Sequence, residues 1–184
     1  MIFIQKIFIS IIVFSIIICI FFIPIFNNSE SFNLNEFNQI INFESTDGFL
    51  WPAPGYTRIN SYFGKRNAPT SGASTIHKGI DIGAKFNSPI VAPANGKVQI
   101  AHGWDGTGYG RFITIDHGKI NGKQITSWYG HLNKSVVTTG QLVYKGQTVI
   151  GYVGQTGNAS GSHLHFGIQE NGVFVNPIRY IGRY

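Results

Sequence analysis

The chain has 184 residues and a formal net charge of +6, with 43% hydrophobic residues, 14% aromatic residues and 23 glycines. This composition excludes intrinsic disorder of the whole chain, and the single cysteine, Cys19, excludes a domain held together by disulfides. A coiled coil is excluded as well, because all but one of the glycines lie after residue 48, where they would interrupt any long helix.

The N-terminal segment, residues 1–26, is predicted to be a membrane anchor. From Ile7 to Phe26 the chain carries no charged side chain, and about 20 apolar residues suffice to cross a bilayer as a helix. Lys6 precedes this run and acidic residues follow it, so the positive-inside rule places the rest of the chain outside the cytoplasm. The run is longer than a typical signal-peptide core, and no small-residue cleavage site follows it. We therefore favour an uncleaved transmembrane helix at residues 7–26, with a cleaved signal segment and a secreted protein as the alternative.

Residues 27–48 are predicted to be a polar linker, because they contain four acids and no basic residue. Residues 49–184 have the opposite balance, with 13 of the 14 Lys and Arg and four of the eight Asp and Glu. Such a basic domain suits an anionic partner, although basic charge alone often serves only to solvate a surface.

The domain at residues 49–184 is predicted to be mainly β. Short apolar runs alternate with glycine-rich turns, and Asn121-Gly122 between two alternating runs is a typical hairpin turn. No long helical period is present, so the spacing favours an all-β domain. The expected strands are residues 58–63, 90–101, 111–117, 124–132, 147–153 and 163–169.

Alternation within the strand at 163–169 places two histidines together. His163 and His165 share one face, with Cα atoms about 6–7 Å apart, and Leu164 anchors the opposite face in the core. Two imidazoles on one strand face favour a metal site over the more common structural role of a lone histidine. Alternation alone leaves open which of the two would bind a metal.

The aromatic residues offer weaker signals. In the strand at 124–132, Tyr129 and His131 share one face with Ile125 and Ser127, while Trp128 lies on the other face, which we assign to the core. Trp104, in the glycine-rich loop 103–110, is the better candidate for an aromatic side chain that stacks on a ligand.

The segment His77-Lys-Gly-Ile-Asp81 adds a histidine and a carboxylate. On a regular strand these two residues would lie about 13 Å apart, too far for one metal, and Gly79 disfavours a helix. The segment is therefore predicted to bend and to bring His77 and Asp81 to a common point. Two histidines and one aspartate leave an open position on zinc, which is typical of a catalytic site.

Together these motifs resemble those of the M23 (lysostaphin/LytM-type) zinc metallopeptidases. A lone H-x-x-x-D motif is weak, but six segments in the right order are specific. The matching segments are residues 61–66, 77–81, 88–98, 116–118, 129–132 and 154–165.

The resemblance implies a fold of antiparallel β-sheets that form a substrate groove, with one Zn²⁺ at its floor. His77, Asp81 and His165 match the metal ligands of the family, and His131 and His163 match the two catalytic histidines that do not bind the metal. One of these would act as the base, since no glutamate lies near the motifs.

The two remaining histidines have no part in that site. His117 matches a His-Gly element outside the zinc site and is expected to be structural, whereas His102 matches nothing and is expected in a surface loop.

The resemblance and the predicted export imply peptidoglycan as the substrate. Members of the family hydrolyse peptide cross-links or stem peptides, which places the domain in the periplasm or another extracytoplasmic space of a bacterial cell envelope. The lysostaphin group often has a tyrosine just before the first histidine, and residues 68–76 contain none. This favours a D,D-endopeptidase that cleaves D-Ala–diaminopimelate links over one that cleaves oligoglycine bridges. The sequence does not identify any regulatory envelope protein as a partner.

Two other functions compete with this interpretation. An inactive binder that activates another wall hydrolase would lack ligands or catalytic histidines, and all five positions are filled here. A nucleic-acid-binding β-barrel would account for the basic charge and the aromatics, but it leaves the His/Asp pattern unexplained and conflicts with export. No nucleic-acid partner is therefore expected.

Overall fold

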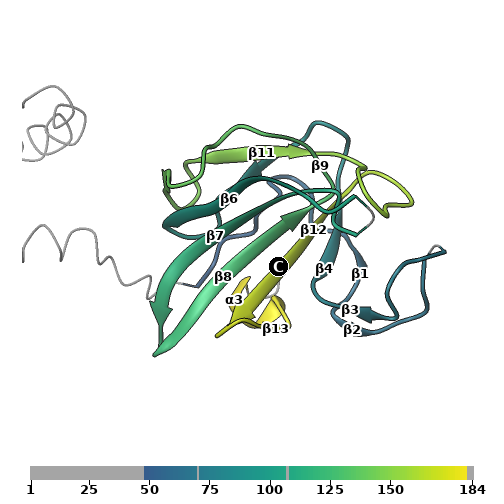
Figure 1. The fold of residues 1–184 in the computed structure, drawn as a ribbon, viewed down its shortest axis with the longest axis horizontal. Helices are drawn as coiled ribbons and strands as arrows, with labels where there is room; N and C mark the ends of the chain where they lie inside the picture. The colour runs from purple at the N-terminus through teal and green to yellow at the C-terminus, as the bar shows by residue number, and fades with distance from the viewer. Residues whose placement is uncertain (1–47, 70, 107, 182–184) are drawn as a thin grey trace, which may run out of the picture. The chain divides into compact units, whose positions relative to one another are not determined.

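The computed structural model describes residues 48–69, 71–106 and 108–181. The predicted anchor at residues 1–26 and all but the last residue of the linker lie outside this part of the chain. In the described part, no helix is both long enough and apolar enough to span a membrane. The described residues form two antiparallel β-sheets and a small two-stranded ribbon (Figure 1).

The larger sheet has eight strands in the order β1-β4-β12-β8-β7-β6-β10, with β13 also paired to β12. Every neighbouring pair is antiparallel, as expected for a chain that turns back at glycine-rich hairpins. Its strands are β1 (Ile59–Ser61), β4 (Ile80–Gly83), β6 (Gly96–Trp104), β7 (Arg111–Ile120), β8 (Lys123–Gly130), β10 (Leu142–Val143), β12 (His163–Glu170) and β13 (Val173–Val175).

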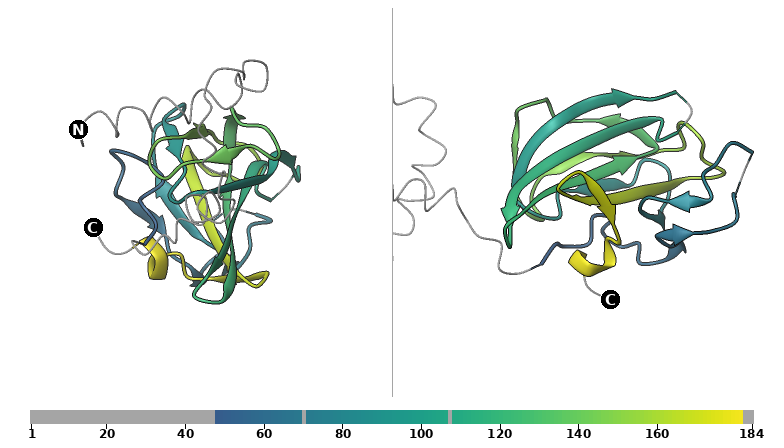
Figure 2. Two further views of the ribbon diagram at one scale, coloured as in Figure 1. Left: turned by 90° about the vertical axis from the view of Figure 1, so that its left-hand side faces the viewer. Right: turned by 60° about the horizontal axis from the view of Figure 1, so that its bottom comes forward.

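A three-stranded sheet, β5-β11-β9, covers one face of the larger sheet (Figures 1 and 2). A Cβ atom placed at Gly151 of β11 would lie 3.4 Å from Cδ1 of Ile113 in β7, so the two sheets touch there. The remaining elements are β5 (Pro89–Val91), β9 (Leu132–Ser135), β11 (Val149–Val153), the ribbon β2 (Gly64–Lys65) with β3 (Ile76–His77), and the short helix α3 (Ile178–Ile181).

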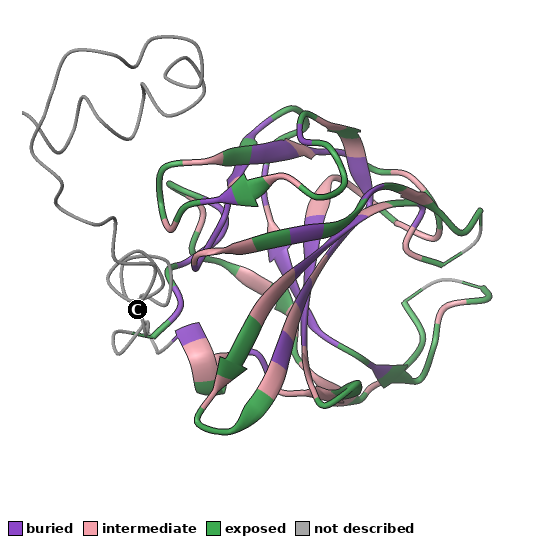
Figure 3. Ribbon diagram, turned by 60° about the vertical axis from the view of Figure 1, so that its left-hand side comes forward, coloured by how far each residue is buried: buried purple, intermediate pink, exposed green. Residues whose placement is uncertain are grey.

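The core lies between these two sheets, and β12 shows how the sequence builds it (Figure 3). Leu164, Phe166 and Ile168 are 0% exposed and point to the core side, while His163 and His165 occupy the other face. The predicted alternation along this strand is therefore confirmed. Along β12, the larger sheet therefore has an apolar face that packs in the core and an opposite face that carries the two histidines.

Two expected strands are split in the structure. The run 90–101 becomes β5 and β6, which belong to different sheets, because the turn around Asn95 redirects the chain. The run 124–132 becomes β8 and β9, which separate at His131. At the first break the chain passes from the smaller sheet to the larger one, and at the second it passes back to the smaller sheet.

The prediction that Trp128 faces the core is wrong. The core side of β8 carries Ser127 and Tyr129, both 0% exposed, so Trp128 lies on the opposite face. There it pairs across the sheet with Gly167 of β12 and stacks on Phe112, with ring centroids 5.4 Å apart and planes at 18°. The polar face of the sheet therefore has an aromatic section next to its histidines.

His117 has the structural role that was expected of it. Its Nδ1 lies 2.7 Å from the carbonyl oxygen of Asn95, and its Nε2 lies 2.7 Å from Oγ of Ser127, which in turn lies 2.8 Å from the hydroxyl of Tyr129. Burial lowers the pKa of His117 to about 4, although the Asn95 carbonyl opposes this shift. His102, by contrast, is exposed, but it lies on strand β6 and not in a loop.

Replacement of the half-buried His117 is expected to change how stability depends on pH. A histidine in an unfolded chain titrates near pH ~6.5, so between that value and about 4 the unfolded state binds a proton that folded His117 does not. Its contribution is complete above pH ~6.5 and is lost as the pH falls through this window, by at most about 1.4 kcal/mol per pH unit.

Denaturant unfolding between pH ~7 and ~4.5 should therefore show a weaker acid dependence for His117→Gln than for the unsubstituted chain. His102→Gln removes an exposed histidine and serves as the matched control. An H117Q slope equal to that of the control would contradict the burial argument.

Candidate metal centre

The chain bends between β3 and β4, as predicted for the His77–Asp81 segment. Strand β3 ends at His77 and β4 begins at Ile80, so Lys78 and Gly79 form the bend. A Cβ atom at Gly79 would lie 2.5 Å from the carbonyl oxygen of Phe166 and 2.7 Å from Nε2 of His165. Only glycine lets this backbone approach β12 so closely, and that approach brings the first motif against the last.

Three ligand-type atoms meet at this point. Nε2 of His77 lies 3.0 Å from Oδ1 of Asp81 and 3.0 Å from Nδ1 of His165. Nδ1 of His165 lies 2.9 Å from the same oxygen of Asp81. All three residues are at least nine-tenths buried, and within the described residues they form a cluster suited to a metal ion.

Hydrogen bonds outside the cluster orient its members. Nδ1 of His77 lies 2.9 Å from the carbonyl oxygen of Tyr62, which can only accept, so this nitrogen carries the proton and Nε2 offers a lone pair. The other carboxylate oxygen of Asp81 accepts a hydrogen bond from Nη1 of Arg66 at 2.9 Å, and that guanidinium also donates to Ser61 Oγ at 2.6 Å. Asp81 is thus held on both sides, which fixes Oδ1 in the cluster.

The electrostatics of the cluster favour an ionised Asp81 beside a neutral His165. Burial raises the pKa of Asp81, but its hydrogen bonds with His165 and His77 outweigh burial and hold that pKa well below its usual range. Burial lowers the pKa of His165. Deprotonated ligands are the forms that bind metal.

The three atoms fit a metal ion better than they fit one another. A proton on Nδ1 of His165 can serve one or two of the three close contacts, but it leaves the lone pairs of His77 Nε2 and Asp81 Oδ1 facing each other at 3.0 Å. A cation among them would satisfy every contact. Two imidazole nitrogens and a carboxylate oxygen form a ligand set that zinc uses, with room for a further ligand.

The second pair of predicted site residues, His131 and His163, adjoins this cluster. Their ring centroids are 4.6 Å apart, and the ring of His131 is 5.9 Å from that of His165. Nδ1 of His131 lies 2.8 Å from the carbonyl oxygen of Thr156, and Nδ1 of His163 lies 2.8 Å from that of Gly161. Each therefore donates through Nδ1 and keeps a lone pair on Nε2. The structure brings all five predicted residues together.

His131 reaches the site only because it breaks the alternation of its strand. Regular alternation would place it on the same face as Tyr129, as the sequence suggested, and in the structure that face is the core face. Instead its backbone has φ = 60°, a left-handed conformation that is uncommon for a residue other than glycine. Its backbone N–H donates to the carbonyl oxygen of Tyr109 at 2.6 Å. Burial, followed by the nearby His163, lowers the pKa of His131 to about 4.

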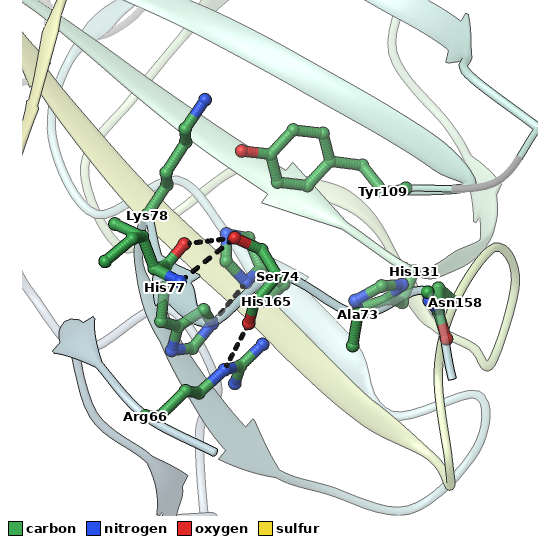
Figure 4. A pocket seen from close by; sticks show the side chains of 12 residues that line it. Arg66, Ala73, Ser74, His77, Lys78, Tyr109, His131, Asn158 and His165 are labelled. Atoms are coloured by element: carbon green, nitrogen blue, oxygen red, sulfur yellow. Dashed lines mark hydrogen bonds between the residues drawn. The ribbon is translucent and has the colours of Figure 1, made fainter. Parts of the chain in front are cut away.

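A cavity of about 250 Å³ opens over the cluster and is lined by His77, His131 and His165 together with Lys78 and Tyr109 (Figure 4). Tyr109 is the site residue that sequence reasoning missed. Its ring centroid lies 5.0 Å from that of His165, and burial raises its pKa to about 12, so its hydroxyl is protonated at neutral pH. The available signal was its place between two glycines in the loop already considered for Trp104.

Trp104 itself does not reach this cavity. It is 59% exposed and lines a separate cavity of about 280 Å³ with Arg111, whose guanidinium carbon lies 5.8 Å from the Trp104 ring. Trp104 therefore lies outside the cavity over the cluster, where the loop places Tyr109, and its stacking on a ligand stays a prediction.

The described residues define a protein of antiparallel β-sheets with a His–Asp–His site open to a cavity on its polar sheet face. The sequence profile described as Peptidase family M23 matches residues 75–177. The chain belongs to peptidase family M23, and the resemblance found in its motifs is thereby confirmed.

Curated relatives have names that agree with this family. The chain is 39% identical over 123 residues to the DD-carboxypeptidase/endopeptidase Mpg of Neisseria meningitidis, covering 67% of this chain and 27% of that protein. It is 35% identical over 130 residues to the peptidoglycan DD-endopeptidase ShyC of Vibrio cholerae, covering 70% and 28%. The chain thus spans little more than a quarter of the length of these relatives.

Solved structures show the same fold. A zinc-containing peptidase from Vibrio cholerae matches with a TM-score of 0.62 and 30% identity, over 71% of this chain and 39% of that one. The catalytic domain of lysostaphin from Staphylococcus simulans matches with a TM-score of 0.57 and 29% identity, over 67% of this chain and 90% of that one. The predicted mainly β fold is confirmed.

The close packing at Gly79 generates a prediction about metal binding. In Gly79→Ala the new methyl group meets the Phe166 carbonyl and the His165 ring, and such overpacking costs about 1–3 kcal/mol. The bend must move away from β12, which separates His77 from His165. We expect weaker zinc binding and a lower melting temperature, measured by competition with a chelator and by thermal unfolding. Gly161→Ala is the matched control, because a methyl group there meets nothing within 4 Å; equal zinc affinity in both variants would refute the prediction.

Proposed function

We propose that the protein is a zinc-dependent endopeptidase that hydrolyses peptide cross-links or stem peptides of bacterial peptidoglycan. The observation that carries this proposal is that two groups of side chains lie next to each other, with the rings of His131 and His165 5.9 Å apart. Three convergent atoms from His77, Asp81 and His165 suit a metal, and two histidines beside them keep unprotonated Nε2 atoms.

In this proposal His77, Asp81 and His165 bind a single zinc ion. When bound, zinc supplies Lewis acidity, which lowers the pKa of water and polarises a carbonyl group. The Tyr62 carbonyl keeps Nε2 of His77 aimed at the site, and Arg66 keeps one oxygen of Asp81 free for it. The polypeptide therefore contributes ligands whose orientation is set before any metal arrives.

His131 and His163 are proposed to move the protons. Their Nδ1 atoms donate to backbone carbonyls, so each Nε2 is a proton acceptor aimed at the reacting groups. One of them takes a proton from the attacking water at its Nε2. The other, in the form that is also protonated at Nε2, donates a hydrogen bond to the carbonyl oxygen or gives a proton to the departing amine. We assign these two roles to the pair and not to either member.

The surroundings support histidine as the base. Glu170, the one glutamate in the described part of the chain, is occupied elsewhere: its Oε2 lies 2.5 Å from Nζ of Lys123, and Tyr180 donates to its Oε1 at 3.0 Å. It lies at the far end of β12 from His163. A glutamate base of the kind found in other zinc peptidases has no counterpart here.

The names of similar proteins support a proposal about the substrate and the location of this protein. Relatives named as peptidoglycan DD-endopeptidases favour D,D-cleavage of D-Ala–diaminopimelate links over cleavage of oligoglycine. One relative named as a lipoprotein NlpD/LppB homolog agrees with a place in the cell envelope. The uncharged run at residues 7–26 is proposed to anchor the chain in the membrane, with residues 27–48 as a linker to the peptidase domain at 49–184.

The metal and proton-transfer roles are separated by two alanine variants. His165→Ala should lose zinc and activity together, with some stability, because bound metal contributes to folding. His163→Ala should keep one zinc per chain and a near-normal melting temperature, but lose about 10²–10⁴-fold in rate. The measurements are elemental analysis, thermal unfolding and peptidase rate. Zinc lost from H163A and retained in H165A would reverse the assignment, and His131→Ala is expected to behave like H163A.

The function itself is tested on purified peptidoglycan. The zinc-loaded full chain should release muropeptides whose masses, determined by mass spectrometry, identify the bond that is cleaved, and a chelator should abolish the release. Binding to peptidoglycan without any released product, at full zinc occupancy, would instead indicate a binder that acts through another hydrolase.

A further inference from the structure

Lys78 is a cation beside the metal cavity without an acidic partner among the described residues. The other cationic residue lining this cavity, Arg66, is paired with Asp81. Lys78 is exposed, and its ammonium group lies 5.7 Å from the ring centroid of Phe174, a contact that leaves its hydrogen-bonding protons free. A positive charge is therefore available to a ligand in the cavity.

Tyr109 supplies a second donor from another element. The carboxylate of Asp105 accepts backbone hydrogen bonds from Gly108, Tyr109 and Gly110, at 2.7–3.1 Å, and so fixes the loop. Within the described residues the Tyr109 side chain makes ring contacts only. Figure 4 shows its hydroxyl directed toward the part of the cavity where the Lys78 side chain ends.

A row of aromatic rings joins these two donors. The ring of Phe174, which lies beneath the ammonium of Lys78, is 5.6 Å from that of Trp128. The ring of Trp128 is in turn 5.6 Å from that of Tyr109. This row gives the two donors a common rigid support along the polar face of the sheet. It also accounts for the place of Trp128 away from the core.

We propose that Lys78 and Tyr109 form a carboxylate-binding subsite next to the metal centre. An ammonium group and a phenolic hydroxyl are both donors to a carboxylate, and such charge-assisted hydrogen bonds are the stronger kind. None of the described residues that line this cavity is acidic. The subsite therefore takes an anionic group of the substrate, which makes Lys78 and Tyr109 specificity-determining residues. This inference rests on the proposed peptidase function.

The ligand chemistry is a free carboxylate on the carbon that carries the scissile nitrogen. In a D-Ala–diaminopimelate cross-link, the amine side of the bond has such a carboxylate on diaminopimelate. A terminal D-Ala-D-Ala bond has one on the last alanine. The inner bonds of an oligoglycine bridge have none, so the subsite would favour the first two substrates over the third.

The test uses two cross-linked muropeptides that differ only at this group, one with the diaminopimelate carboxylate free and one with it as a carboxamide. The zinc-loaded full chain should cleave the carboxylate form with a kcat/KM on the order of tenfold higher. In Lys78→Gln this preference should largely disappear, through loss of activity on the carboxylate form alone. Tyr109→Phe, which keeps the ring and removes the hydroxyl, should reduce the preference partially, and Lys78→Glu should favour the carboxamide.

Lys119→Gln is the control, because it removes the same charge from an exposed position at the opposite end of the β7–β8 hairpin from His131. Its preference should equal that of the unsubstituted chain. A pentapeptide ending in D-Ala-D-Ala, tested on the same variants, distinguishes a terminal carboxylate from that of diaminopimelate as the bound group.

The possible results distinguish a failure of the proposed subsite from a failure of the proposed peptidase function. Equal cleavage of both muropeptides by the unsubstituted chain, or a preference that K78Q leaves unchanged, would overturn the subsite while the peptidase function stands. Equal losses on both muropeptides in K78Q would also overturn it. No cleavage of either by the zinc-loaded chain would overturn the proposed function, and the subsite with it.

Discussion

The site depends on the register between β4 and β12, which sets Asp81 directly opposite His165. Asp81 and His165 are far apart in sequence but lie opposite each other because β4 and β12 are hydrogen-bonded neighbours. A shift of one residue in the pairing of these strands would turn one of the two side chains toward the core. Asp81 then connects the two sides of the site, with Arg66 on one carboxylate oxygen and the imidazoles on the other. The bend at Gly79, the position of His77 and the cavity above them all follow from this one strand pairing.

The sequence predicts most of this arrangement where strands are regular. Along β12 the assignment of His163 and Leu164 to opposite faces was correct, because a strand paired on both sides has little freedom to twist out of alternation. It failed at His131, where a left-handed backbone reverses the direction of the side chain. It also failed for Trp128, since alternation separates two faces but does not say which of them is covered by a second sheet.

Other features left no sequence signal strong enough to use. The ribbon strands β2 and β3 have two residues each, too few to show a period. The direction of the Tyr109 side chain depends on the hydrogen bonds that three backbone N–H groups donate to the Asp105 carboxylate. Composition does not predict these hydrogen bonds. The choice of His165 over His163 as the proposed metal ligand came from the family resemblance. In the structure Nδ1 of His165 is 2.9 Å from Asp81 Oδ1, whereas Nε2 of His163 is 3.6 Å away.

Two sets of hydrogen bonds fix the β6–β7 loop. Within the loop, the Asp105 carboxylate accepts the backbone N–H of Tyr109. Between the loop and the residue that follows β8, the carbonyl oxygen of Tyr109 accepts a hydrogen bond from the backbone N–H of His131. Insertions in surface loops are a common route by which related enzymes diverge, but a longer loop here would displace His131 along with Tyr109. A change in the length of this loop would therefore move Tyr109 and His131 together, whereas the exchange of a single side chain in it would leave the backbone hydrogen bond between them in place.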